Sequence, residues 1–284
     1  MSTFTTSDGL TLYYEDTGSG LPILCLAGLT RNCRDFDFVA PHLPGIRLIR
    51  LDYRGRGQSD WAKDFHTYNV VREGQDALEL LDHLGLPSAA ILGTSRGGLI
   101  AMILAATARH RLRGVALVDI GPELDLSGLE FIMGYLGKNP NSKTLAELAQ
   151  ARMAIMKPNF PDVPLERWLA EVTNTYTQTD SGVIINYDPK LRDAILATGA
   201  KGAEDEDGAA STPDLWPMFE AITGLPAAII HGANSDLLSH ATVDEMARRN
   251  PALIVAHVPN RAHIPFLDEP EALTALHQWI KEMS

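Results

Sequence analysis

A serine flanked by two glycines in the pattern G-x-S-x-G occupies residues 93–97. A serine hydroxyl becomes a strong nucleophile when a neighbouring base accepts its proton. An apolar run at residues 90–92 precedes the pattern, and apolar residues at helical spacing follow it, which predicts a strand that turns sharply into a helix. In such a turn Gly93 and Gly97 leave room for neighbouring chain, while Ser95 takes a strained conformation that lifts its hydroxyl clear of the sheet. Ser95 is therefore the candidate nucleophile.

Two later loops supply the groups that such a nucleophile needs. Asp236 follows a predicted strand at residues 227–230, and His263 follows another at residues 253–258. In an open α/β sheet, the loops at the carboxyl ends of the strands converge on one crevice. A histidine can then accept the serine proton, and an aspartate can fix its tautomer and stabilise its cation. We expect Ser95, His263 and Asp236 to form a triad.

A developing oxyanion also needs donors, and two backbone N–H groups are placed to provide them. One belongs to Arg96, directly after the nucleophile, and the other to Leu29, directly after Ala27 and Gly28. Neither donor depends on its side chain.

Several polar residues carry alternative interpretations. Asp119 ends a predicted strand and competes with Asp236 as the triad acid, although it could instead cap the loop at Gly121. Three arginines near the oxyanion side are expected to form salt bridges more readily than to bind a substrate carboxylate: Arg31, Arg34 and Arg96. Among the other histidines, His231 and His257 are expected in the core, whereas His66 and His240 remain open as pocket-lining groups.

Strands alternate with helices through most of the chain, which predicts an α/β fold with a mostly parallel sheet covered on both faces. The expected strands are 11–15, 22–26, 46–51, 90–92, 115–119, 227–230 and 253–258, and the expected helices include 34–43, 70–84 and 273–280. Between residues 126 and 215 the pattern becomes helical only, which predicts an inserted segment rich in large apolar side chains.

The order of these motifs resembles the α/β-hydrolase superfamily, and within it a capped, serine esterase or lipase-like member. The resemblance covers roughly residues 10–125 and 216–284 and includes a D-x-R-G-x-G-x-S loop at residues 52–59. It implies a core of residues 1–125 and 216–284 with a helical cap at 126–215. It also assigns Ser95 as nucleophile, His263 as base and Asp236 as acid, with the amides of Leu29 and Arg96 as oxyanion donors.

The resemblance implies a cofactor-independent hydrolase, without a metal, that acts on a small, largely apolar carboxylic ester, lactone or similar acyl compound through an acyl-enzyme. An aspartate nucleophile would be expected in a haloalkane dehalogenase or epoxide hydrolase, and Ser95 excludes that chemistry. Carbon–carbon bond hydrolysis of the meta-cleavage-product type is the alternative, although Ile264 stands where those relatives commonly have an aromatic residue. A non-catalytic ligand receptor with the same fold is a further alternative.

The charge and composition of the chain limit the kinds of binding partner that it can have. The 284 residues carry a formal net charge of −12, which argues against a nucleic-acid or anionic-membrane surface. No signal sequence or membrane span is recognisable, and Cys25 reads as a small buried hydrophobe, so we expect a cytoplasmic monomer or homodimer acting on a small molecule. The acidic stretch at residues 202–208 is expected to be a solvated loop.

Overall fold

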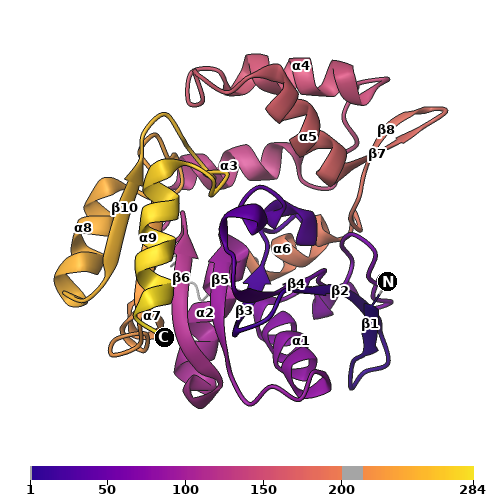
Figure 1. Cartoon of the computed structure of the whole chain (residues 1–284). Helices are drawn as coiled ribbons and strands as arrows, with labels where there is room; N and C mark the ends of the chain where they lie inside the picture. The colour runs from indigo at the N-terminus through magenta and orange to yellow at the C-terminus, as the bar shows by residue number, and fades with distance from the viewer. Residues whose placement is uncertain (1, 200–213) are drawn as a thin grey trace, which may run out of the picture.

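The computed structural model of the chain describes residues 2–199 and 214–284. An eight-stranded sheet lies at its centre, in the order β1-β2-β4-β3-β5-β6-β9-β10 (Figure 1). The first two strands are antiparallel to their neighbours, and the six from β4 to β10 are parallel. The strands span Ser2–Thr5, Thr11–Thr17, Leu21–Leu26, Ile46–Leu51, Ala89–Thr94, Leu112–Val118, Ala227–Gly232 and Ile254–Val258. The predicted α/β class is confirmed.

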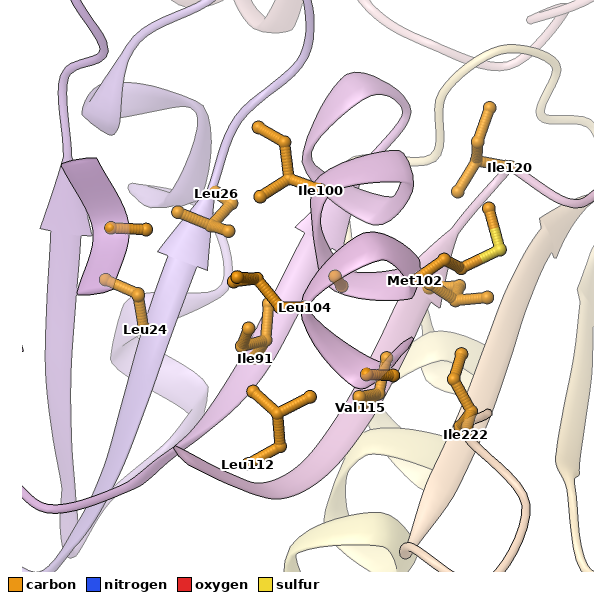
Figure 2. Close-up of a cluster of buried hydrophobic side chains, with 14 of the residues drawn as sticks. Leu24, Leu26, Ile91, Ile100, Met102, Leu104, Leu112, Val115, Ile120 and Ile222 are labelled. Atoms are coloured by element: carbon orange, nitrogen blue, oxygen red, sulfur yellow. The ribbon is translucent and has the colours of Figure 1, made fainter. Parts of the chain in front are cut away.

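Helices cover both faces of the sheet, as its apolar strands require. One face packs against α1 (Val70–His83), α2 (Arg96–Thr107), α7 (Trp216–Glu220) and α8 (His240–Arg249). Figure 2 shows side chains of α2, such as Ile100 and Leu104, against Leu26 and Ile91 of the sheet. The opposite face packs against α9 (Pro270–Lys281) and two short 3₁₀ turns.

Those two turns replace the single helix predicted at residues 34–43. The structure has 3₁₀ turns at Cys33–Phe36 and Ala40–His42 instead. Pro41 explains the difference, because it has no N–H to donate to the carbonyl one turn earlier and disfavours helical geometry in the residue before it. The N-terminal strand β1 is an addition that the sequence did not predict.

The predicted insertion, residues 126–215, contains four helices among its described residues: α3 (Leu126–Tyr135), α4 (Leu145–Met156), α5 (Leu165–Thr175) and α6 (Leu191–Gly199). In Figure 1, α3, α4 and α5 lie over the carboxyl ends of the parallel strands. The prediction of helices alone was wrong, because β7 (Tyr176–Thr179) and β8 (Gly182–Ile185) form an antiparallel hairpin. Its strands are rich in β-branched residues, a signal that the sequence carried. The acidic stretch at residues 202–208 lies outside the described residues.

No helix in the described parts of the chain combines the length and apolar character that crossing a bilayer would require.

Candidate active site

Ser95 lies at the sharp junction of β5 and α2, in the conformation that the motif predicts. Its backbone φ is 50° and its ψ is −113°, a strained region for a residue with a side chain. The flanking glycines are required by close packing. A Cβ on Gly93 would lie 2.5 Å from the carbonyl oxygen of Gly97, and one on Gly97 would lie 2.0 Å from that of Leu26. Larger residues at either position would therefore displace the turn.

His263 stands between Ser95 and a buried carboxylate. Its Nε2 is 3.0 Å from Ser95 Oγ, and its Nδ1 is 2.8 Å from Oδ2 of Asp119. Because a carboxylate can only accept, Nδ1 carries the hydrogen and the lone pair of Nε2 faces the serine hydroxyl. The three side chains form a continuous hydrogen-bonded line from a carboxylate to a hydroxyl.

The acid in this line is Asp119, and the expected pairing of His263 with Asp236 is wrong. Asp119 follows β6 directly and is fully buried, with Oδ1 accepting from Gly232 N at 2.7 Å and Oδ2 from Ser235 Oγ at 2.6 Å. Asp236 lies four residues beyond the end of β9, where Ser127 Oγ of α3 donates to its carbonyl at 3.2 Å. This backbone contact places Asp236 on the cavity wall instead of behind the imidazole.

Both predicted oxyanion donors belong to residues close to Ser95 in the chain or in the cavity. Arg96 is the first residue of α2, so its N–H has no carbonyl one turn earlier to bind. Leu29 lines the same cavity as Ser95, and its N–H donates to no other described residue. The carbonyl of Leu29 accepts from Arg56 Nε at 3.0 Å, which fixes the orientation of that part of the loop.

The Arg96 side chain points into the protein, away from the cavity. Its Nε is 2.6 Å from Glu73 Oε2, and Arg56 Nη1 is 2.7 Å from Glu73 Oε1, with Glu73 fully buried in α1. Burial raises the pKa of Glu73, but the two guanidinium groups more than offset this and hold it below its ordinary value. The expected salt-bridge role of Arg96 is confirmed. Arg34 and Arg31 also form ion pairs, with Asp37 and Glu171 respectively.

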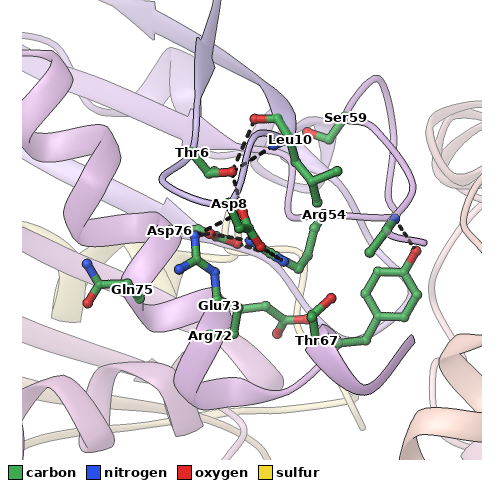
Figure 3. A network of polar contacts seen from close by, with 12 residues as sticks. Thr6, Asp8, Leu10, Arg54, Ser59, Thr67, Arg72, Glu73, Gln75 and Asp76 are labelled. Carbon is green, nitrogen blue, oxygen red and sulfur yellow. Dashed lines mark hydrogen bonds and ion pairs between the residues drawn. The ribbon is translucent and has the colours of Figure 1, made fainter. Parts of the chain in front are cut away.

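A neighbouring network anchors the loop that carries Arg56. Arg54 is fully buried and donates to Asp76 of α1 at 2.6 and 2.7 Å and to Asp8 at 2.8 Å (Figure 3). Arg72 of α1 joins Asp76 at 2.8 Å. The predicted loop at residues 52–59 is thereby tied to α1 through charged side chains.

The cavity above Ser95 has an apolar roof and a charged end. Its wall includes these side chains from the inserted segment: Phe131, Ile132, Tyr135, Arg152, Ile155, Met156 and Asn159. Other large apolar residues of the insertion pack together, as Phe160 and Trp168 do with ring centroids 5.4 Å apart. His66 and His240 do not line this cavity.

Arg31 and Arg152 form the charged end. Arg31 is paired with the buried Glu171, and Arg152 Nε lies 3.2 Å from Oε2 of the same carboxylate. The Nη groups of Arg152 donate to no other described residue, although Arg152 lines the cavity that contains Ser95. These Nη groups are therefore available to an anion in the cavity. Close by, Asp35 lies 3.5 Å from Arg31, and burial raises the pKa of this carboxyl.

Comparison with known proteins agrees with this architecture. The family model for the alpha/beta hydrolase fold matches residues 22–270. The chain is 34% identical to a 3-hydroxybutyrate-oligomer hydrolase from Cupriavidus necator over 276 residues, covering 94% of this chain and 91% of the relative. It is 36% identical to the AB hydrolase superfamily protein YisY from Bacillus subtilis over 286 residues, covering 95% of each chain.

A solved structure is similar over nearly the whole chain. The crystal structure of an alpha/beta hydrolase from Novosphingobium aromaticivorans superposes with a TM-score of 0.87 at 36% identity, covering 99% of this chain and 97% of that one. The matched region includes the strands that carry Ser95, Asp119 and His263. The chain is therefore a hydrolase that belongs to the α/β-hydrolase fold family.

Proposed function

We propose that the protein is a serine hydrolase that cleaves a carboxylic ester through a triad of Ser95, His263 and Asp119. The observation that carries the proposal is the pair of distances at His263, 3.0 Å to Ser95 Oγ and 2.8 Å to Asp119 Oδ2. Asp119 takes the role that the sequence assigned to Asp236. Its two further hydrogen bonds hold the carboxylate so that the imidazole keeps the orientation the serine needs.

The reaction runs in two halves. Ser95 Oγ attacks the carbonyl carbon while its proton passes to His263 Nε2, and the amides of Leu29 and Arg96 stabilise the negative oxygen. His263 then gives that proton to the leaving alkoxide as the carbon–oxygen bond breaks, which leaves an acyl group on Ser95. A water molecule transfers a proton to His263 and attacks the acyl carbon, and the proton returns to Ser95 as the acid is released.

The substrate that fits the cavity is a short ester with an apolar body and a carboxylate at one end. Phe131, Ile132 and Met156 provide apolar contacts, and Arg152 offers unused donors for the carboxylate. An oligoester of a hydroxycarboxylic acid has this shape, and the relative from Cupriavidus necator is named for hydrolysis of such an oligomer. We therefore place the linear dimer of 3-hydroxybutyrate in the substrate class of this protein.

Two variants test the nucleophile. Ser95→Ala should lower turnover of the 3-hydroxybutyrate dimer and of a short aryl ester by roughly a thousandfold or more, because no other group replaces the hydroxyl. The Ser95→Ala variant should also no longer be labelled by a fluorophosphonate probe. Ser88→Ala is the matched control. Ser88 lies just before the first residue of β5, at the end of the strand away from Ser95, so this variant should keep full activity and labelling.

The alternatives give distinct results in the same assay. Unchanged turnover in Ser95→Ala would overturn the proposed nucleophile. Turnover of a coloured dienoate diketone, with no hydrolysis of either ester, would favour carbon–carbon bond cleavage, and tight ligand binding without turnover of any substrate would favour a receptor.

A further inference from the structure

Three histidines gather at one edge of the sheet, outside the cavity that contains Ser95. His231 is in β9, His257 is its register partner in the edge strand β10, and His240 is the first residue of α8. Figure 1 shows α8 beside β10 at this edge. The ring centroids are 4.6, 4.9 and 5.1 Å apart, and one ring nitrogen of each histidine lies within 4.8 Å of one from each of the others.

Backbone carbonyls select the tautomers of two of these rings. Nε2 of His231 lies 2.9 Å from the carbonyl oxygen of Leu238, and Nε2 of His240 lies 3.1 Å from that of Ala233. A carbonyl only accepts, so each Nε2 carries the hydrogen and each Nδ1 carries the lone pair. Metal-binding histidines are commonly oriented by this kind of contact from the second ring nitrogen.

His257 completes the group. Its Nδ1 is 2.9 Å from Nδ1 of His231, so in the free protein it donates to that lone pair. Its Nε2 has no partner among the described residues, and the side chain is exposed. The proton of His257 can therefore move to Nε2, through solvent, and leave its Nδ1 free as a ligand.

One carboxylate lies near two of these rings. Asp244, one helical turn after His240, is exposed and has no hydrogen bond or ion pair to another described residue. Its negative charge faces the same two histidines.

We propose that His231, His240 and His257 form a zinc-binding site that joins β9, β10 and α8. Three imidazole nitrogens with an open fourth position for water or for Asp244 match the ligand type and number that Zn²⁺ accepts. Ligand nitrogens around tetrahedral zinc lie about 3.3 Å apart. The Nδ1 atoms of His231 and His257, which are 2.9 Å apart, need to separate by a few tenths of an ångström, and the nitrogen of the exposed His240, within 4.8 Å of both, needs to adjust to the same spacing. The exposed ring of His257 permits that movement. The site lies outside the proposed triad, and no ester chemistry depends on it.

Zinc binding should be measured on the full chain without a polyhistidine tag, after treatment with a chelator. Titration with Zn²⁺, followed by calorimetry and metal analysis, should show one tight site for each chain, and Mg²⁺ should not occupy it because it prefers oxygen ligands. His240→Ala and His257→Ala should each weaken binding at least tenfold, and the double variant should lose it. His110→Ala removes an exposed histidine elsewhere and should bind like the unaltered protein.

Two further readouts separate ligation from loss of fold. Zn²⁺ should raise the melting temperature of the unaltered protein and of His110→Ala but not of the double variant, whose ester hydrolysis should remain normal. Co²⁺ should give the intense visible absorption of four-coordinate cobalt only in proteins that retain both His240 and His257. Equal zinc binding by the unaltered protein and the double variant, or a cobalt spectrum like that of the free ion, would overturn the site.

Discussion

Asp119 uses both carboxylate oxygens at the site, one for a backbone amide and the other for a serine hydroxyl and the imidazole. A fully buried carboxylate with three hydrogen bonds is held firmly, because each bond offsets part of the cost of removing the charge from water. Ser235, next to Asp236, supplies one of those bonds. The loop after β9 therefore supports the acid without containing it.

Substitution of each aspartate distinguishes the two candidates. Asp119→Asn should lower kcat by roughly ten-thousandfold, because an amide at that position favours the wrong tautomer of His263. Asp236→Asn should change kcat by less than about tenfold, since Nδ1 of the imidazole bonds Asp119 and not the Asp236 side chain. The measurement is steady-state hydrolysis of an aryl ester by folded variants. The opposite order of effects would return the acid role to Asp236.

Arg152 should set the preference for a substrate carboxylate. Arg152→Gln should raise KM for the 3-hydroxybutyrate dimer by roughly ten- to a hundredfold, because a charge-assisted hydrogen bond of about 1.5–3 kcal/mol is lost. The methyl ester of the same dimer should be hydrolysed equally by both proteins. Arg34→Gln is the control, since Arg34 forms an exposed pair with Asp37. An equal loss on the acid and its methyl ester would contradict a charge contact.

Elements around the nucleophile are coupled through buried arginines. Helix α1 carries Glu73, which binds Arg96 at the start of α2 and Arg56 beside the Leu29 loop. Both proposed oxyanion donors therefore depend on one carboxylate for the position of their segments. Arg54 lies in the same loop and is equally buried, but it binds Asp76 and Asp8.

This difference gives a matched pair of substitutions. Arg56→Lys should lower kcat by about tenfold or more with little change in KM. A lysine ammonium lacks the planar, forked donors of arginine and cannot donate to Glu73 and to the Leu29 carbonyl in the same geometry. Arg54→Lys should lower the melting temperature by a similar amount while kcat stays close to that of the unaltered protein. Equal kcat in both variants would mean that Arg56 acts only on stability.

Across the whole molecule, the inserted segment is attached to the loops that surround the site. Asn32 Nδ2 donates to the carbonyl of Asn174 at 2.8 Å, and the Tyr68 hydroxyl donates to Asp188 at 2.6 Å. Arg31 reaches Glu171 of α5 from the same side of the sheet. These contacts attach the described part of the insertion to the loops around the site, including the Leu29 loop, so we expect substrate choice and oxyanion geometry to be linked.

Much of this architecture follows from local sequence. The alternation of apolar runs and helical spacing predicted the parallel sheet, and the two glycines around Ser95 predicted its turn, because both signals arise from residues close together in the chain. Ser95 and His263 were identified in the same way. The 3₁₀ turns and the β7–β8 hairpin differed where a proline or β-branched residues outweighed the broader pattern.

The tertiary structure decided which distant segments pair with one another. The sequence alone determined the fold class and placed Ser95 and His263 at strand ends, but two aspartates followed suitable strands. Sheet order put β6 between β5 and β9, and Thr94 is the register partner of Val118, so Ser95 and Asp119 leave adjacent strands at the same level. His231 and His257 meet for the same reason, through the register of β9 with β10, and His240 joins them from α8. Such contacts depend on register and packing between segments, which local spacing does not encode.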